Sequence, residues 1–173
     1  MPKFQRKFWK PIDCGDYYDI PLNQGKYAKI DKEDLALIEN RSWTYSQGYA
    51  VCTAPGNWKH QRVISMHRRI LDLTDKKIHV DHINHDGLDN RRQNIRVCTH
   101  SQNLKNRNLS SNNTSGYHGV YFLKSSGTWY ARIIVNGLLI HLGHYAEKED
   151  AIAARMKAEK KFFGEFRNVN LNL

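Results

Sequence analysis

Cysteine is scarce in this sequence of 173 residues. The three cysteines, Cys14, Cys52 and Cys98, lie far apart and form no C-x-x-C pair. A disulfide framework usually has an even set of cysteines, and a cysteine-based zinc module has closely paired thiols. The sequence therefore argues against both, and we expect ordinary thiols in a reducing compartment.

Long hydrophobic runs are also missing. The longest apolar stretches, such as 133–135 and 138–140, are much shorter than the roughly 20 residues that span a membrane. The start, MPKFQRKFWKPIDCG, is basic but lacks the apolar stretch of a secretory signal. These absences predict an intracellular protein that does not insert into a membrane.

Acidic residues are outnumbered. The chain has 27 lysines and arginines against 17 acidic residues, which gives a formal net charge of +10. Such an excess is typical of proteins that bind nucleic acid, although it can also serve solubility alone.

Residues 17–103 predict a small α+β unit of short strands and short helices. Asp31, Ser65 and Thr99 are candidate helix caps, and Gln102 completes a capping-box pattern with Thr99. The expected strands cover residues 17–20, 27–30, 42–45, 49–53, 62–64, 78–83 and 95–98.

The last part of the chain predicts a three-stranded antiparallel sheet packed on one helix. YHGVYFL, TWYARIIV and LLIHL read as strands, and Asn136–Gly137 is a strong hairpin signal between the last two. A helix over 147–163 would cover one face. The other face is expected to be basic and aromatic, and it should carry His118, Tyr121, Tyr130, Arg132 and His141. Such a face suits the DNA major groove, although an ordinary solvated face is the alternative.

Asp81 and His82 stand at the end of an expected strand, beside a polar loop over 84–94. A carboxylate is a hard oxygen ligand for a divalent cation, and a neutral imidazole can take a proton from water. The helix after the next strand brings in Asn103, whose amide oxygen is a second ligand of this kind. Two such oxygens, with substrate phosphate and waters, suit Mg²⁺.

Two other interpretations of this stretch stay open. Zinc could bind through imidazoles from His79, His82, His85 and His100, although their spacing matches no standard ligand pattern. The stretch could also be a polar loop without chemistry. His67, on an expected amphipathic helix, is more naturally a core or bracing residue than a catalyst.

VDHINHDGLDNRRQNIRVCTHSQN resembles the HNH endonuclease family of the ββα-metal fold, in the branch found in bacteriophages and mobile introns. IPLNQGKYAKIDKEDLALI, WTYSQGYAV and MHRRIL extend the resemblance upstream. It implies that His82 is the general base, that Asp81 and Asn103 ligate the metal, and that Asn94 braces the loop that positions His82. Asn103 stands where the family usually has a histidine.

The C-terminal part resembles the APETALA-type (ethylene-response-factor) DNA-binding domain. The matching features are YxGV, WxARI, Leu142–Gly143, the alanine-rich helix and the final FGEFRNVN. The two resemblances imply an α+β chain with four parts: a basic N-terminal segment at 1–16, an HNH domain with a small N-terminal α+β extension at 17–107, a linker at 108–115, and the DNA-binding domain at 116–173.

The expected function is a homing-type, site-specific DNA endonuclease that works in a bacterial host and uses Mg²⁺, with Mn²⁺ as a substitute. One active site per chain predicts nicking by a monomer, with a dimer left open. A DNA-binding regulator without catalysis and an RNA-directed enzyme are the alternatives. The expected contacts to double-stranded DNA are Arg91, Arg92, Lys105, Arg107, His118, Tyr121, Lys124, Tyr130, Arg132 and His141.

Overall fold

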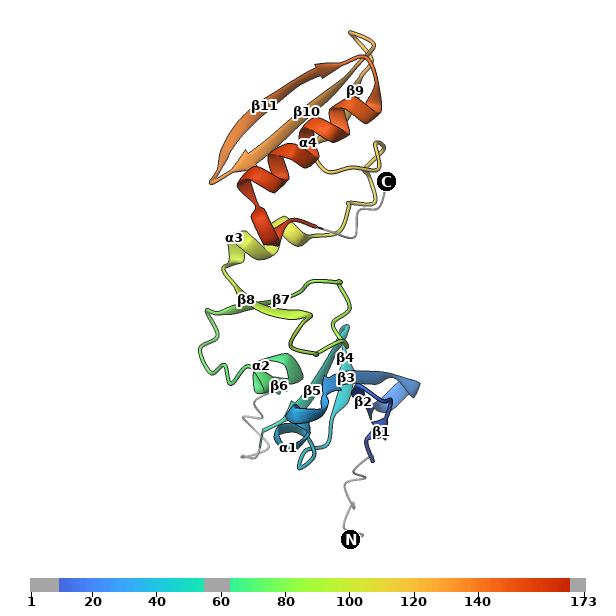
Figure 1. Cartoon of the computed structure of the whole chain (residues 1–173), viewed down its shortest axis with the longest axis vertical. Coiled ribbons are helices and arrows are strands. Elements are labelled where there is room, and N and C mark those ends of the chain that lie inside the picture. The colour runs from blue at the N-terminus through green and yellow to red at the C-terminus, as the bar shows by residue number, and fades with distance from the viewer. Residues whose placement is uncertain (1–9, 55–62, 169–173) are drawn as a thin grey trace. The chain divides into compact units, whose positions relative to one another are not determined.

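The computed structural model describes residues 10–54 and 63–168. The chain is mixed α and β, with several small antiparallel sheets and few helices (Figure 1). It divides into two compact units, residues 1–98 and residues 99–173.

The first unit is built from short strands. Its strands are β1 (Ile12–Asp13), β2 (Tyr17–Pro21), β3 (Tyr27–Asp31), β4 (Thr44–Ser46), β5 (Tyr49–Thr53), β6 (Val63–Ser65), β7 (His79–His82) and β8 (Ile95–Cys98). They pair as three antiparallel sheets, β1-β2-β3, β4-β5-β6 and β7-β8. The helices of this unit are α1 (Leu35–Ile38) and α2 (Met66–Ile70).

One hydrophobic cluster holds these elements of the first unit together. Ile30 from β3, Ile38 from α1 and Met66 from α2 are fully buried in it. Ile95 of β8 joins the same cluster, so the β7-β8 hairpin is anchored to the unit by apolar packing. Burial of such side chains contributes about 1.5–3 kcal/mol each.

Two of the expected helix caps are absent, which corrects the sequence prediction. Neither Asp31 nor Ser65 makes a side-chain cap hydrogen bond. Asp31 instead accepts a hydrogen bond at 2.6 Å from the backbone N–H of Arg92, a residue far along the chain. The expected strand at 62–64 appears as β6 from Val63, and Arg62 lies outside the described residues.

The second unit contains one antiparallel sheet of order β11-β10-β9, with β9 at Val120–Leu123, β10 at Thr128–Val135 and β11 at Leu138–Tyr145. Asn136 and Gly137 join β10 to β11 with φ of 51° and 81°. These left-handed conformations are those of a tight hairpin turn, as the sequence predicted. The unit also contains α3 (His100–Asn103) and α4 (Lys148–Phe162).

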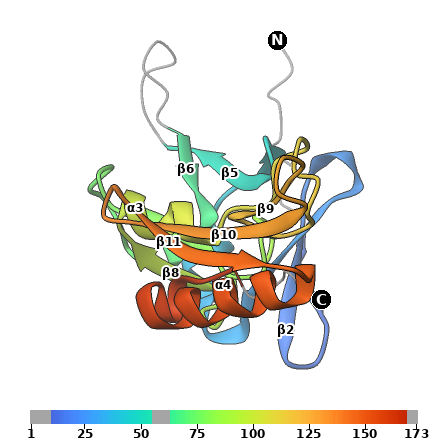
Figure 2. The same cartoon turned by 90° about the horizontal axis from the view of Figure 1, so that it is seen from above.

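Helix α4 covers one face of this sheet, and Figure 2 shows it running along β10 and β11. Ala131 of β10 and Ala151 of α4 are fully buried in the same cluster, where small side chains let the helix approach closely. Trp129, Tyr145 and Leu142 close this cluster at its edges. The expected sheet-and-helix arrangement is therefore present as local structure.

The border between the units lies before Thr99, earlier than the predicted linker at 108–115. A compact unit and a sequence module need not share a border, so the predicted domain boundaries remain a prediction. In the described ranges, no helix combines the length and the apolar character that crossing a bilayer requires.

Candidate active site

Asp81 and His82 are the last two residues of β7. This strand pairs with β8 so that Asp81 lies opposite Arg96 and His82 lies opposite Ile95. Both residues are buried, with 5% and 7% of the residue surface exposed. The two residues are therefore consecutive in the chain and both largely shielded from bulk water, at the point where the strand ends and the polar loop begins.

Asp81 forms a buried ion pair with Arg96. The Nε and Nη2 atoms of Arg96 donate to the same oxygen, Oδ2 of Asp81, at 2.9 and 2.6 Å. The two side chains are 14% and 6% exposed. Removing one partner of such a buried ion pair is costly, because the remaining charge is left buried without compensation.

His82 lies against two other rings. Its ring centroid is 5.0 Å from that of His67 on α2 and 5.8 Å from that of Tyr49 on β5. Tyr49 and His67 also contact each other at 5.6 Å. One strand and one helix of the first unit thus place rings around the end of β7. The contact with His82 agrees with the interpretation of His67 as a bracing residue.

Burial keeps both imidazoles uncharged. It lowers the pKa of His82, and the Asn90 side chain and the Asp81 carboxylate oppose this shift only in part. Burial, reinforced by the proximity of His82, lowers the pKa of His67 to about 3. An uncharged imidazole has a lone pair that can accept a proton, which is what a general base requires.

Asn94 bridges the two ends of the polar loop. Its Oδ1 accepts a hydrogen bond from the backbone N–H of Asn84 at 3.0 Å, and its Nδ2 donates to the carbonyl of Asp89 at 2.7 Å. Asn84 in turn donates from Nδ2 to the Asp89 carboxylate at 3.0 Å. These bonds fix the path of the chain immediately after His82.

The same loop is anchored to β3 and to the β4–β5 hairpin. The backbone of Lys29 exchanges hydrogen bonds of 2.8 Å with Leu88 and Asn90, and Asn90 is fully buried. At Gly87 the chain passes so close to Gly48 and Tyr49 that an added Cβ would overlap both. The loop is therefore packed down beside the ring that contacts His82.

Arg91 and Arg92 are engaged within the first unit. Arg91 donates from Nε and Nη2 to the Asp89 carboxylate, both at 2.7 Å. Arg92 forms a two-pronged pair with the buried Asp34, with its shortest contact at 2.6 Å. Their expected role as DNA clamps stays a prediction, and any contact with DNA would compete with these pairs.

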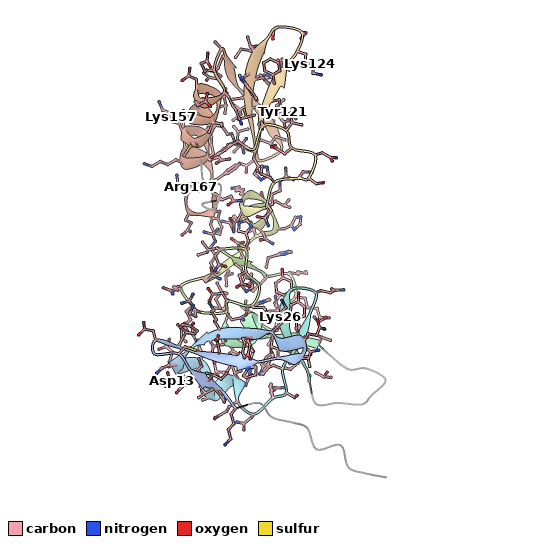
Figure 3. All side chains as sticks on the ribbon, turned by 90° about the vertical axis from the view of Figure 1, so that its right-hand side faces the viewer. Asp13, Lys26, Tyr121, Lys124, Lys157 and Arg167 are labelled. Atoms are coloured by element: carbon pink, nitrogen blue, oxygen red, sulfur yellow. The ribbon has the colours of Figure 1, made fainter. Side chains whose placement is uncertain are left out.

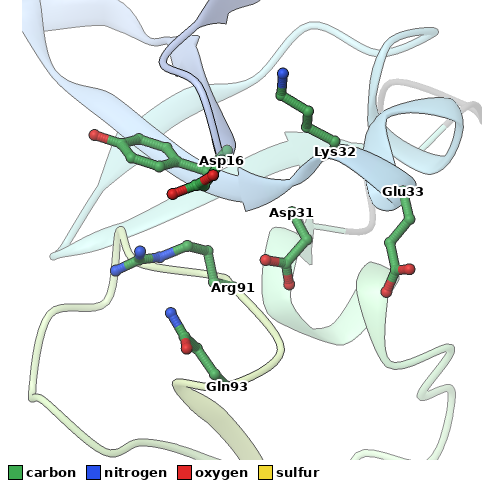
Figure 4. A pocket seen from close by; sticks show the side chains of 7 residues that line it. Asp16, Asp31, Lys32, Glu33, Arg91 and Gln93 are labelled. Carbon is green, nitrogen blue, oxygen red and sulfur yellow. The ribbon is translucent and has the colours of Figure 1, made fainter.

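A pocket of about 710 Å³ opens next to Arg91, between β2, β3 and the loop. Figure 4 shows Asp16, Asp31, Lys32, Glu33 and Gln93 around it. Neither Asp81 nor His82 lines this pocket, so it is distinct from the candidate catalytic pair.

Asn103, the other expected metal ligand, is the last residue of α3 in the second unit. Thr99 caps this helix in a full capping box: its side chain accepts from the Gln102 backbone at 3.2 Å, and the Gln102 side chain accepts from the Thr99 backbone at 2.8 Å. The predicted capping box is confirmed. It fixes the turn of helix that ends at Asn103.

The two expected metal ligands, Asp81 in the first unit and Asn103 in the second, each carry oxygen donors suited to a hard divalent cation. Within residues 10–54 and 63–168, no group of three or more His, Cys, Asp or Glu side chains is arranged to hold a metal. Magnesium commonly takes only one or two protein oxygens and completes its shell with phosphate and water. The Asp81 carboxylate and the Asn103 amide are donors of that type.

The sheet of the second unit carries a basic and aromatic face opposite α4. On it, Tyr130 lies between Tyr121 of β9 and His144 of β11, and Arg132 lies opposite His141. The Tyr130 hydroxyl and His141 Nδ1 are hydrogen-bonded at 2.5 Å, and the Arg132 guanidinium lies over the Tyr121 ring at 4.9 Å.

His118 and Lys124 flank this face rather than lying within it. His118 precedes β9, and its Nε2 is hydrogen-bonded to the Arg107 carbonyl at 3.0 Å. Figure 3 shows Lys124 beyond the end of the strand that carries Tyr121. The sequence placed His118 on the sheet face, and its position in the preceding turn corrects this.

A groove of about 630 Å³ in the second unit joins the sheet to the segment after α3. Lys105 and Arg107 line it together with Tyr121 and Arg132, and no acidic residue contributes to its lining among the described residues. His118 lines it as well, so five of the expected DNA contacts share one basic groove.

Three features of the site were not predicted from the sequence: the Arg96 partner of Asp81, the Tyr49 ring beside His82, and the buried Asn90. Arg96 directly follows Ile95 on β8, so its side chain is expected on the opposite face from Ile95. Only the register of β7 with β8 shows that its partner there is Asp81. No sequence signal points to Tyr49, because its contact depends on the packing of separate sheets.

Comparison with known proteins supports a nuclease. Residues 73–105 match the family model of the HNH endonuclease, a group that generally uses a divalent metal. The matched segment contains Asp81, His82, Asn94, Arg96 and Asn103.

The chain is also similar to an uncharacterized HNH endonuclease of Acanthamoeba polyphaga mimivirus. The two are 28% identical over 167 residues, which cover 92% of this chain and 83% of the viral protein. No solved structure matches the chain. From the family match and the viral relative together, the protein is a nuclease with an HNH endonuclease domain at residues 73–105.

Proposed function

We propose that the protein is a site-specific DNA endonuclease that hydrolyses a phosphodiester bond with one divalent metal and His82 as the general base. The observation that carries this proposal is the buried His82, whose pKa is lowered by burial and which directly follows the buried Asp81 in the chain, inside the segment that matches the HNH endonuclease family. Phosphodiester hydrolysis needs a proton acceptor for water and a hard cation at the phosphate, and these two side chains supply a group for each.

His82 takes the proton from the attacking water. The rings of His67 and Tyr49 hold its imidazole in place, and burial keeps the imidazole uncharged near neutral pH. Asn94 braces the loop behind it through its bonds to Asn84 and Asp89. The base is therefore pre-oriented before substrate arrives, which reduces the entropy cost of the reaction.

Asp81 and Asn103 would hold the metal, Mg²⁺ by preference and Mn²⁺ as a substitute. When bound, the metal would stabilise the negative charge that develops on the phosphate and on the leaving 3′ oxygen. The products would carry 5′-phosphate and 3′-hydroxyl ends. The hard oxygen chemistry of both side chains favours these ions over zinc.

The second unit would direct the nuclease to double-stranded DNA. We assign its sheet to an APETALA-type DNA-binding domain whose open face enters the major groove, with Tyr121, Tyr130, Arg132 and His141 in contact. Lys105 and Arg107, which line the basic groove beside this face, would follow the phosphate backbone. His118, Lys124, Arg91 and Arg92 are secondary candidates for backbone contacts.

One catalytic site per chain would cut one strand, so we propose a homing-type nicking enzyme that acts as a monomer. Duplex DNA fits a sheet in the major groove better than duplex RNA does, because the major groove of A-form RNA is narrow.

A plasmid assay tests the catalytic part. Wild-type protein with Mg²⁺ or Mn²⁺ should convert supercoiled plasmid to the nicked circle, and ligase should reseal the nick because its ends are 5′-phosphate and 3′-hydroxyl. Asp81→Asn should abolish nicking, whereas Asp72→Asn, which alters an exposed carboxylate of the first unit, should not. Tight DNA binding without cleavage under all these conditions would instead identify a DNA-binding protein without catalysis.

A binding assay tests the targeting part. Arg132→Gln should weaken duplex binding by about tenfold and lower its salt dependence. Lys157→Gln, on the exposed side of α4, removes the same charge and should leave both nearly unchanged. Equal effects of the two substitutions would contradict the assignment of the sheet face.

A further inference from the structure

We propose that Arg96 is the positioning residue of the metal site: it is the counter-ion of Asp81 in the metal-free protein and competes with the metal for that carboxylate. The inference rests on the proposed role of Asp81 as a metal ligand. It adds that the ion pair with Arg96 controls when the Asp81 carboxylate becomes accessible to the cation.

The register of the β7-β8 hairpin creates this pairing. Asp81 and Arg96 are directly opposite on the two strands, so their side chains meet without any contribution from loops. Both guanidinium donors converge on one oxygen, Oδ2, at 2.9 and 2.6 Å. A one-residue change of register would separate the pair and turn Asp81 to the other face of the hairpin.

Burial explains why the pair is needed. The Asp81 side chain is 6% exposed, and an ionised carboxylate removed from water is strongly destabilised unless a positive charge is nearby. Arg96 therefore compensates the buried charge of Asp81 and orients its carboxylate until a metal arrives.

The same pair opposes metal binding. A divalent cation at the Asp81 carboxylate would stand within a few ångströms of a guanidinium that already donates twice to Oδ2, and two positive charges at that distance repel. Metal binding must therefore weaken or displace the ion pair. Affinity for the metal should be low in the free protein and should rise when substrate phosphate supplies further negative charge and oxygen ligands.

Mn²⁺ binding to the full-length protein without DNA tests this competition. Arg96→Gln keeps a hydrogen-bond donor but removes the charge, so it should bind Mn²⁺ about tenfold more tightly than wild type, as measured by electron paramagnetic resonance of the free ion. Arg96→Lys keeps the charge and should bind nearly as weakly as wild type. Arg92→Gln breaks the comparable pair with Asp34 and is the matched control, for which no change is expected.

Unchanged or weaker Mn²⁺ binding by Arg96→Gln would overturn the proposal. A purely structural role predicts that outcome, because loss of the brace would disorder Asp81. Asp81→Asn distinguishes failure of the Arg96 proposal from failure of the proposed ligand role of Asp81. If Asp81→Asn abolishes Mn²⁺ binding while Arg96→Gln changes nothing, only the role of Arg96 fails. If Asp81→Asn binds Mn²⁺ as wild type does, both the ligand assignment and the inference fail.

A second readout follows the wild-type protein, and the only variant that it needs is Arg96→Lys, for the assignment. In ¹⁵N-labelled protein titrated with Mg²⁺, the Nε–Hε resonance of Arg96, assigned by its absence in Arg96→Lys, should shift as the bond to Asp81 weakens. The Nε–Hε resonance of Arg91, which is paired with Asp89, is the internal reference. An Arg96 resonance that stays fixed at saturating Mg²⁺ would overturn the proposal.

Discussion

The imidazole rings of His67 and His82 meet edge to face, with centroids 5.0 Å apart and planes inclined by 82°. The contact joins α2 to the end of β7. Burial lowers the pKa of both rings, and the proximity of His82 lowers that of His67 further. We therefore expect the orientation of His82 to depend on His67.

His67→Ala should lower both activity and stability. Removal of the ring leaves a cavity beside His82, and we expect a loss of about 1–3 kcal/mol in the free energy of unfolding, measured by urea denaturation. The cleavage rate should fall while DNA affinity stays close to wild type. His144→Ala, which removes an exposed imidazole, should change stability little; equal losses in the two variants would contradict the bracing role of His67.

The stability of the protein should fall as the pH drops below neutrality, in part because of His67. The unfolded chain binds a proton at His67 near pH 6.5, whereas the folded protein resists this proton down to about pH 3. Between these values the unfolded state holds more protons, so the free energy of unfolding decreases by up to about 1.4 kcal/mol per pH unit from this group.

Comparison with His67→Gln isolates this contribution, since glutamine does not titrate. Between pH 7 and pH 5 the wild type should lose more stability in urea denaturation than the variant does. The acidic groups contribute nearly equally to both proteins and cancel in the difference. Parallel pH dependences would show that His67 is as easily charged in the folded protein as in the unfolded chain.

Asn94→Ala should destabilise the loop that follows His82. The substitution removes a buried amide that accepts from Asn84 and donates to Asp89, and it leaves both backbone groups without these bonds. We expect a loss of about 1–3 kcal/mol in the free energy of unfolding. Gln93→Ala removes the neighbouring, exposed amide and should cost much less; similar costs would mean that Asn94 is not a brace.

Ala151→Leu should test the close packing of α4 on the sheet of the second unit. Ala151 is fully buried against the cluster that contains Ala131, so a larger side chain must push the helix away and cost about 1–3 kcal/mol. Ala153→Leu makes the same change at an exposed position of the same helix. Thermal unfolding should separate the two variants, and equal melting temperatures would contradict the packing described.

Local chemistry explains why parts of this fold could be read from the sequence. The Asn136–Gly137 turn, the Thr99–Gln102 capping box and the strands of the last sheet each depend on residues close together in the chain. Asp31 and Ser65 have the right residue types for caps, but neither side chain makes a cap hydrogen bond. Asp31 accepts the Arg92 backbone N–H, 61 residues along the chain.

The candidate site divides in the same way. Asp81 and His82 can be picked out because a carboxylate and an imidazole are consecutive at the end of an expected strand. Asn94 can be picked out because it matches the HNH pattern. The Arg96 partner required the register of β7 with β8, and the Tyr49 contact required the packing of two sheets. Such relationships arise only when separate elements are brought together, so residue types alone do not reveal them.

The central claim is that His82 activates the water in DNA cleavage, and the single-turnover cleavage rate of His82→Ala tests it most directly. With Mg²⁺ and saturating enzyme, the account predicts a rate about 10²–10⁴-fold below wild type, with DNA affinity retained and with partial recovery when imidazole is added. A His82→Ala protein that cleaves DNA as fast as wild type would contradict the account.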